Sequence, residues 1–289
     1  MRYGVGYKGS KSQIAKDIID FLPPGRRLID LFGGGGAITH CAALSGKWET
    51  VIYSDIDPLI VSLCEDFFAG RYAGRTDIFG WVSREEFKRR KDTDPLVKWL
   101  WSFGTDGESY IYGVDKIPTA EAIHRAIADQ EYSARFLALT GGRLWFRGAT
   151  IHERRLEWVK FRRAQGVLSS NDHAQAITRL DTLTASRRLH NVRVLRRSYA
   201  DYTYRRGDVV YCDIPYRGTD CGSYDGFDHA KFYEWARHVP CYISEYRMPP
   251  GFREVWQREK YVLSGRGGNN LKTTERLYRS PAANFVRKA

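Results

Sequence analysis

The chain has 289 residues, of which 43% are hydrophobic, and a formal net charge of +12 at pH 7. This length suits one large domain or a core domain with an insertion, and the composition excludes a disordered polymer. No apolar run reaches transmembrane length, and the first residues lack the apolar segment of a signal peptide. We therefore expect a cytoplasmic protein, and the positive charge favours an anionic partner, foremost nucleic acid.

The first part of the chain alternates helical and strand patterns. Residues 12–23 carry apolar side chains at helical spacing and end in two prolines, which stop a helix. Residues 26–32 and 50–57 are predicted strands, and residues 37–46 and 58–70 are predicted helices. Strands that alternate with helices indicate a parallel sheet with crossover helices, hence an α/β fold.

Charged helical segments dominate between about residues 77 and 190. The strand pattern resumes at residues 193–202 and 208–216, and a helix, a strand and two closing strands are predicted after it. The sequence therefore predicts an α/β domain formed by residues 1–76 and 191–289, interrupted by an inserted, mostly helical domain at residues 77–190.

A glycine loop, DLFGGGG at residues 30–36, separates the first predicted strand from its helix. Glycines let the backbone approach a ligand at a helix N-terminus. No Gly-Lys-Ser/Thr follows, so this is no P-loop, and Thr39 stands where the dinucleotide motif needs a third glycine or alanine. Asp55 ends the next strand, where a carboxylate can accept both hydroxyls of a ribose.

Two ligands fit this pattern: a dinucleotide, or the nucleoside end of S-adenosylmethionine. Asp30 distinguishes them, because a carboxylate would repel a pyrophosphate but attract the cationic amine of the methionine moiety. The sequence therefore favours S-adenosylmethionine over a nicotinamide cofactor, and a methyltransferase over an oxidoreductase.

The predicted strand at residues 208–213 ends in Asp213-Ile214-Pro215-Tyr216. With the glycine loop, this tetrapeptide resembles the signature of the Dam-like, alpha-group (D12 class) DNA adenine-N6 methyltransferases of prokaryotes and phages, in which two prolines separate the acid from the aromatic residue. The order also agrees: the segment GYKGSK, the glycine loop, the insertion and then the tetrapeptide. Ile214 replaces the first proline but keeps the backbone carbonyl.

The resemblance implies a Rossmann-like, S-adenosylmethionine-dependent methyltransferase sheet whose insertion is the target-recognition domain. It implies transfer of a methyl group to the N6 amine of a flipped adenine in duplex DNA, at a specific site. The implied cofactor-binding residues are Tyr7, Lys11 near the cofactor carboxylate, Asp30, Phe32, Gly34 and Gly36 at the methionine half, Asp55 at the ribose, Asp201 near the adenine, and Asp213.

The chemistry of methyl transfer to an exocyclic amine explains the tetrapeptide. Such an amine is a poor nucleophile, because its lone pair is delocalised into the ring. The Asp213 carboxylate and the Ile214 carbonyl could accept its two N–H groups and so localise the lone pair. Pro215 restricts the turn, and Tyr216 offers a face on which the extruded base can stack. These four residues are the predicted catalytic residues, and they require no metal.

The predicted insertion carries the densest positive charge. Between residues 143 and 197 there are 13 lysines and arginines against four acidic residues, interleaved with aromatic residues. Binding of duplex DNA needs neutralisation of phosphates, so we expect a DNA contact surface here. The expected phosphate contacts are Arg143, Arg147, Arg154, Arg155, Lys160, Arg162 and Arg163.

Three alternatives stay open: a DNA cytosine-N4 methyltransferase, an RNA adenine methyltransferase, and a catalytically silent relative that binds DNA. The seven histidines show no ligand spacing and the five cysteines no CxxC pair, so no metal is expected. A DNA-associated protein of a prokaryotic or phage-infected cytoplasm is expected. A monomer is favoured over an oligomer.

Overall fold

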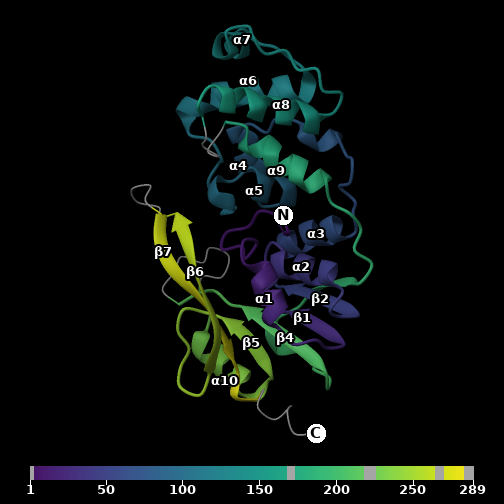
Figure 1. Ribbon diagram of the computed structural model, residues 1–289, viewed down its shortest axis with the longest axis vertical. Helices are drawn as coiled ribbons and strands as arrows, with labels where there is room; N and C mark the ends of the chain where they lie inside the picture. Colours follow the sequence, from purple (N-terminus) through teal and green to yellow (C-terminus); the bar gives the residue numbers. More distant parts are fainter. Residues whose placement is uncertain (1–2, 168–172, 218–225, 264–269, 283–289) are drawn as a thin grey trace. The chain divides into compact units, whose positions relative to one another are not determined.

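The computed structural model describes residues 3–167, 173–217, 226–263 and 270–282 (Figure 1). The chain divides into two compact units. The first comprises Met1–Gly4, Ser10–Cys64 and Leu189–Ala289, and the second comprises Val5–Gly9 and Glu65–Arg188. The chain passes from the first unit to the second after Cys64 and returns after Arg188, whereas the sequence-based boundaries are 76/77 and 190/191. Residues 5–9 also belong to the second unit.

The first unit is built on a seven-stranded sheet in the order β3-β2-β1-β4-β5-β7-β6. Neighbouring strands from β3 to β5 are parallel, whereas β7 runs antiparallel to both β5 and β6. Its elements are α1 (Ala15–Phe21), β1 (Arg27–Asp30), α2 (Ala37–Ser45), β2 (Thr50–Asp55), β3 (Val192–Arg196), η4 (Tyr199–Asp201), β4 (Asp208–Asp213), α10 (His229–His238), β5 (Cys241–Ser244), β6 (Arg253–Leu263) and β7 (Asn270–Arg279); α3 (Pro58–Phe68) begins in it.

The strand order reverses direction between β1 and β4. From β1 the chain proceeds outward to β2 and β3, and it returns to the other side of β1 with β4 and β5. In an open α/β sheet a ligand binds at the carboxyl ends of the strands beside such a reversal. Asp30 and Asp213 end the two strands at this point, so the fold places both predicted motifs at one edge of the sheet.

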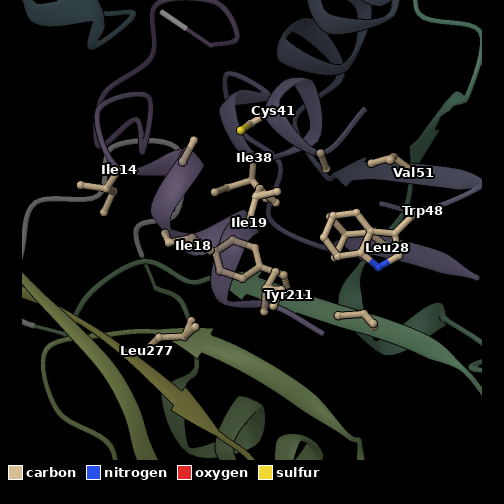
Figure 2. Packing of buried hydrophobic residues seen from close by; sticks show 14 residues of the cluster. Ile14, Ile18, Ile19, Leu28, Ile38, Cys41, Trp48, Val51, Tyr211 and Leu277 are labelled. Carbon is tan, nitrogen blue, oxygen red and sulfur yellow. The ribbon is translucent and has the colours of Figure 1, made fainter. Parts of the chain in front are cut away.

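Alternating strand residues supply the two hydrophobic layers of this unit. Leu28, Val51, Val209 and Tyr211 face α1 and α2, which add Ile18, Ile38 and their neighbours (Figure 2). The intervening positions Ile29, Ile52, Val210 and Cys212 pack with Phe232 and Ala236 of α10 in a second cluster. Successive side chains of a strand point to opposite faces, so both faces of the sheet are covered and the unit is a Rossmann-like α/β fold.

The second unit is helical over its described length, with one isolated bridge between Ser102 and Tyr110. Its core is aromatic: Trp81 stacks on Tyr112 with ring centroids 5.7 Å apart, and Trp101 packs edge-on against Trp81. The helices are η1 (Asp77–Phe79), α4 (Arg84–Arg90), α5 (Pro95–Leu100), η2 (Phe103–Thr105), η3 (Val114–Lys116), α6 (Ile117–Asp129), α7 (Ala134–Thr140), α8 (Ile151–Ala164) and α9 (Gln175–Thr184).

Capping boxes fix the starts of two helices in this unit. Ser83 opens α4 and pairs with Glu86, and Thr150 opens α8 and pairs with Glu153. In each box the hydroxyl and the carboxylate satisfy backbone N–H groups that have no partner within the helix. The helical character expected for the insertion therefore has a local cause in the sequence.

Candidate active site

The glycine loop of the first unit is held close to β2. Gly33 N–H donates to the Ser54 carbonyl at 2.9 Å, and a Cβ at Gly33 would lie 2.2 Å from the ring of Tyr53. Gly34 and Gly36 have φ angles of +46° and +69°, and Gly36 is the N-cap of α2. Side chains rarely adopt such backbone angles, so glycine is required both by conformation and by space.

Asp55 anchors this loop from the end of β2. Its Oδ2 accepts the backbone N–H of Gly34 at 2.9 Å, and its Oδ1 accepts the N–H of Asp57 at 3.0 Å. The side chain is buried. A carboxylate oxygen has room for a second hydrogen bond, so the ribose-binding role of Asp55 stays a prediction. Its structural role, to hold the glycine loop, was not expected from the sequence.

Asp30 lies at the end of β1 with a carboxyl group that is only half satisfied. Its Oδ2 accepts the Thr39 hydroxyl at 2.8 Å, whereas Oδ1 is buried and has no hydrogen-bond partner among the described residues. Burial raises the pKa of Asp30 to about 7; the Thr39 hydrogen bond opposes this shift, and the Asp213 carboxylate adds to it. A buried acceptor without a partner suits a cationic donor, and the ammonium of a methionine moiety has this chemistry.

An aromatic cluster adjoins the glycine loop. The ring of Phe32 stacks on Tyr199 at 5.6 Å and meets Phe227 and Phe232 edge-on, each at 5.7 Å. Tyr199 opens the short helix η4, which ends at the exposed Asp201. The structure thus brings Phe32 and the segment of Asp201 together. Nothing in the sequence pointed to Tyr199, which belongs to this short helix between β3 and β4.

Tyr7 belongs to the second unit, unlike the other residues expected at the cofactor. Its ring packs against Trp99 with centroids 4.7 Å apart, and Lys8 N–H donates to the Thr105 carbonyl at 3.2 Å. The cofactor contact expected of Tyr7 stays a prediction.

The predicted catalytic turn continues directly from β4. The side chain of Ile214 is buried in the cluster under α10. The carbonyl of Pro215 accepts a hydrogen bond from His229 Nε2 at 2.8 Å. An aliphatic side chain in place of the first proline therefore has a packing function, and His229 of α10 supports the turn.

Lys11 connects the catalytic turn to the closing strand β7. Its ammonium lies 2.6 Å from Asp213 Oδ1, 3.7 Å from Glu275 Oε1 and 4.7 Å from the ring centroid of Tyr216. The Tyr216 hydroxyl donates to Glu275 Oε1. Lys11 and Glu275 are both buried. Four side chains from three segments of the first unit thus form one polar network.

Electrostatics hold this network together. Burial alone would lower the pKa of Lys11, but the facing carboxylates of Asp213 and Glu275 outweigh it and raise that pKa. Burial raises the pKa of Glu275 to about 7, against the opposing effect of the Lys11 ammonium. Lys11 is therefore a permanent cation near neutral pH, whereas Glu275 changes its charge there. The sequence had placed Lys11 near the cofactor carboxylate and had not indicated Glu275.

Most basic residues expected to bind DNA are accessible within the second unit. Arg143, Arg147, Lys160 and Arg163 are exposed. Two further residues have partners within the protein: Arg155 pairs with Asp181 at 2.6 Å, and the guanidinium of Arg162 lies 5.6 Å from the ring centroid of Trp158.

Arg154 has a different environment from these. It is 6% exposed, and its guanidinium donates to the carbonyls of Ile127 and Ala128 at the end of α6 and of Gly148 and Ala149 before α8. This arginine satisfies backbone acceptors in the interior, so its geometry is that of a structural residue and does not fit the expected phosphate contact.

Two further observations concern metals and membranes. Within the described ranges, no group of three or more His, Cys, Asp or Glu side chains is arranged to hold a metal ion. In the same ranges, no helix combines the length and apolarity needed to span a membrane.

Comparison with known proteins identifies relatives. The family model described as D12 class N6 adenine-specific DNA methyltransferase matches residues 7–238. Among solved structures, a Pyrococcus horikoshii protein described as an RNA methyltransferase is similar, with 10% identity and a TM-score of 0.37 over 94% of this chain and 85% of that one. The ribosomal-RNA methyltransferase AviRa of Streptomyces viridochromogenes gives 13% identity and a TM-score of 0.38 over 98% and 90%. No curated protein matches the sequence significantly.

Proposed function

The chain belongs to the D12 class N6 adenine-specific DNA methyltransferases, and we propose that it transfers a methyl group from S-adenosylmethionine to the N6 amine of an adenine flipped out of duplex DNA. One observation carries the proposal beyond family membership. Asp30, with an unsatisfied buried oxygen, and Asp213, which begins the catalytic turn, terminate adjacent parallel strands at the point where the strand order reverses.

The residues around Asp30 fit S-adenosylmethionine, which supplies a methyl group on a positively charged sulfur. Asp30 Oδ1 would accept the ammonium of the methionine moiety, and the backbone of Gly34 and Gly36 would give it close access. Asp55 would hold the ribose. Phe32 would border the methionine moiety, and the segment of Asp201 would border the adenine ring.

The catalytic turn would hold the target base. Asp213 and the Ile214 carbonyl would accept the N–H groups of the adenine amine, and Tyr216 would stack on the ring. Transfer then depends on positioning and on electrostatic stabilisation, without a covalent enzyme intermediate. Asp213 would also receive the proton that the amine loses.

Lys11 would prepare Asp213 for this role. Its ammonium forms a hydrogen-bonded ion pair with the oxygen that would accept the amine, and it lies over the ring on which the base would stack. We propose that the incoming amine replaces the ammonium at Asp213 and that Glu275 then retains Lys11. Glu275 would also orient Tyr216 through the tyrosine hydroxyl. Lys11 thus occupies the Asp213 carboxylate until the base arrives.

The second unit would supply DNA contacts as the target-recognition domain. We propose phosphate contacts for Arg143, Arg147, Lys160 and Arg163, which are exposed, and for Arg155 and Arg162 where their present partners allow it. Arg154 is left out of this set because its guanidinium is used by backbone carbonyls.

The test is methyl transfer from labelled S-adenosylmethionine to duplex DNA and to RNA in parallel, followed by nucleoside analysis. N6-methyladenine in DNA is the expected product. N4-methylcytosine would overturn the base assignment, and product on RNA alone would overturn the substrate. Binding of S-adenosylhomocysteine without any product would indicate a catalytically silent relative.

A further inference from the structure

A cavity of about 710 Å³ lies in the first unit, beside the proposed catalytic turn. The side chains that matter for its chemistry are Arg217, Tyr246, Arg247, Thr273, Thr274 and Arg276. They come from the segment after Tyr216, from the segment after β5 and from β7. The cavity is therefore lined by guanidinium and hydroxyl groups, which are hydrogen-bond donors.

Two contacts join this cavity to the catalytic turn. The ring of Tyr246 packs edge-on against that of Tyr216, with centroids 4.6 Å apart. Arg217 follows Tyr216 directly in the chain, and its backbone N–H donates to Glu245 Oε2 at 3.1 Å. A group bound in the cavity would therefore lie next to a base stacked on Tyr216.

The positive charge of the cavity is largely uncompensated. The guanidinium groups of Arg217 and Arg247 form neither an ion pair nor a hydrogen bond within the described part of the chain, and both side chains are exposed. Arg276 differs, because its Nε lies 3.3 Å from Glu254 Oε2. Arg217 and Arg247 thus remain available to a ligand, and Arg276 adds positive charge to the wall of the cavity.

Glu245 is the acidic residue that lines the cavity, and its oxygens are engaged by backbone. Oε2 accepts the N–H of Arg217, and Oε1 accepts the N–H of Tyr246 at 2.6 Å. The side chain is buried. Glu245 therefore ties the segment after β4 to the segment after β5, and it leaves both guanidinium groups without an acidic partner.

We propose that this cavity binds a phosphodiester group of the DNA strand that carries the target adenine, beside the flipped nucleotide. The inference rests on the proposed function, and it adds a substrate-binding site in the catalytic unit to the surface expected in the second unit. Arginine forks and threonine hydroxyls are standard donors to phosphate oxygens. A nucleotide that rotates out of the stack keeps its flanking phosphates close to its base.

The experiment removes the two available charges together. Arg217→Ala/Arg247→Ala is compared with Lys16→Ala/Arg26→Ala, a control that also loses two exposed positive charges of the first unit, from residues outside the cavity. Duplex DNA binding is measured from low to high salt. We expect the cavity variant to lose affinity at least about tenfold and to lower the salt slope by about 0.9, the contribution of one phosphate contact. The control should stay near wild type, and both variants should retain binding of S-adenosylhomocysteine.

A second measurement identifies the phosphate. Neutral methylphosphonates replace, one at a time, the phosphates flanking the adenine that the wild-type protein methylates. At one position the methylphosphonate should weaken DNA binding by the wild-type protein but not by the cavity variant. The methylphosphonate and the arginine substitutions then remove the same contact.

Three results separate the possible failures. Unchanged affinity and salt slope in the cavity variant, with methyl transfer by the wild type intact, would overturn this inference and leave the proposed function standing. Competition by inorganic phosphate without any methylphosphonate effect would show that the cavity takes a free anion, which also overturns it. Absence of methylated DNA with the wild-type protein would instead be a failure of the proposed function.

Discussion

The ammonium of Lys11 lies 2.6 Å from the Oδ1 atom of Asp213, and both groups belong to the same buried network. An N–H donor thus already sits on the acceptor proposed for the target amine. The proposed mechanism requires this ammonium to leave Asp213 when the base enters.

Replacement of Lys11 by methionine should destabilise the protein and slow methyl transfer. Without the ammonium, the half-buried Asp213 and the buried Glu275 would be neighbouring carboxylates, and loss of one partner of a buried pair costs about 3 kcal/mol or more. The loss should be larger at pH 8 than at pH 5.5, because protonation of Glu275 relieves the repulsion. Urea unfolding at both pH values measures it, with the exposed Lys16→Ala as control. Equal unfolding curves for Lys11→Met and wild type would contradict the pairing.

The substitution Asp30→Asn should preserve the stability of the protein at pH 8 but weaken its binding of the cofactor. Burial raises the pKa of Asp30 from its ordinary value near 4 to about 7, so the folded protein holds a proton that the unfolded chain releases between these values. The contribution of Asp30 to stability therefore falls as pH rises from about 4 to about 7.

The asparagine variant should lack this fall. It should be at least as stable as wild type at pH 8, but it should bind S-adenosylmethionine far more weakly, because the acceptor for the ammonium has lost its charge. Thermal unfolding across this pH range and calorimetric titration at pH 8 measure the two effects. Cofactor affinity equal to that of wild type would refute the assigned role of Asp30.

Glu275→Gln should change the pH dependence of the rate. Glu275 has its pKa raised to about 7, and its ionised form would hold Lys11 away from Asp213 during turnover. At saturating S-adenosylmethionine, the wild-type kcat should rise as pH increases through about 7, whereas the glutamine variant should lack this rise.

Glutamine still accepts a hydrogen bond from the Tyr216 hydroxyl, so the effect would report charge rather than the orientation of the ring. If kcat of the glutamine variant rose with pH as it does in the wild type, the titrating group would not be Glu275.

Two arginine substitutions in the second unit should behave in opposite ways. Arg154→Ala leaves four backbone carbonyls without their donor and should cost about 2 kcal/mol or more in stability, while the folded fraction binds DNA normally. Arg143→Ala should leave stability unchanged and weaken DNA binding with a smaller salt slope. Chemical unfolding and salt-dependent DNA binding of both variants test this contrast. A loss of stability in Arg143→Ala together with a loss of DNA affinity in Arg154→Ala would show that burial does not distinguish a structural arginine from a DNA-binding one.

Much of the fold could be predicted because its signals are local. The glycine loop, the acids that end β1, β2 and β4, and the alternation of strands and helices all lie within short stretches of sequence. These stretches sufficed for the family, for the α/β class and for the placement of Asp30 and Asp213 at one edge of the sheet.

The interior network could not be predicted, because its members come together only in the folded sheet. Glu275 is one acid in a charged closing strand, and nothing nearby in the sequence connects it with Lys11 or Tyr216. The burial of Arg154 could not be predicted either, because the next residue of the same helix, Arg155, has the same side chain. The placement of β7 beside β5, and the packing of α8 beside α6, decide these two roles.

The most direct test of the account is a single-turnover comparison of wild type, Asp213→Ala and the exposed control Glu49→Ala on duplex DNA with labelled S-adenosylmethionine. We expect N6-methyladenine from the wild type and the control. The Asp213 variant should bind DNA and cofactor but retain less than about a hundredth of the rate, because it lacks the acceptor of the amine. A rate within about tenfold of wild type would contradict the central role of the Asp213 carboxylate.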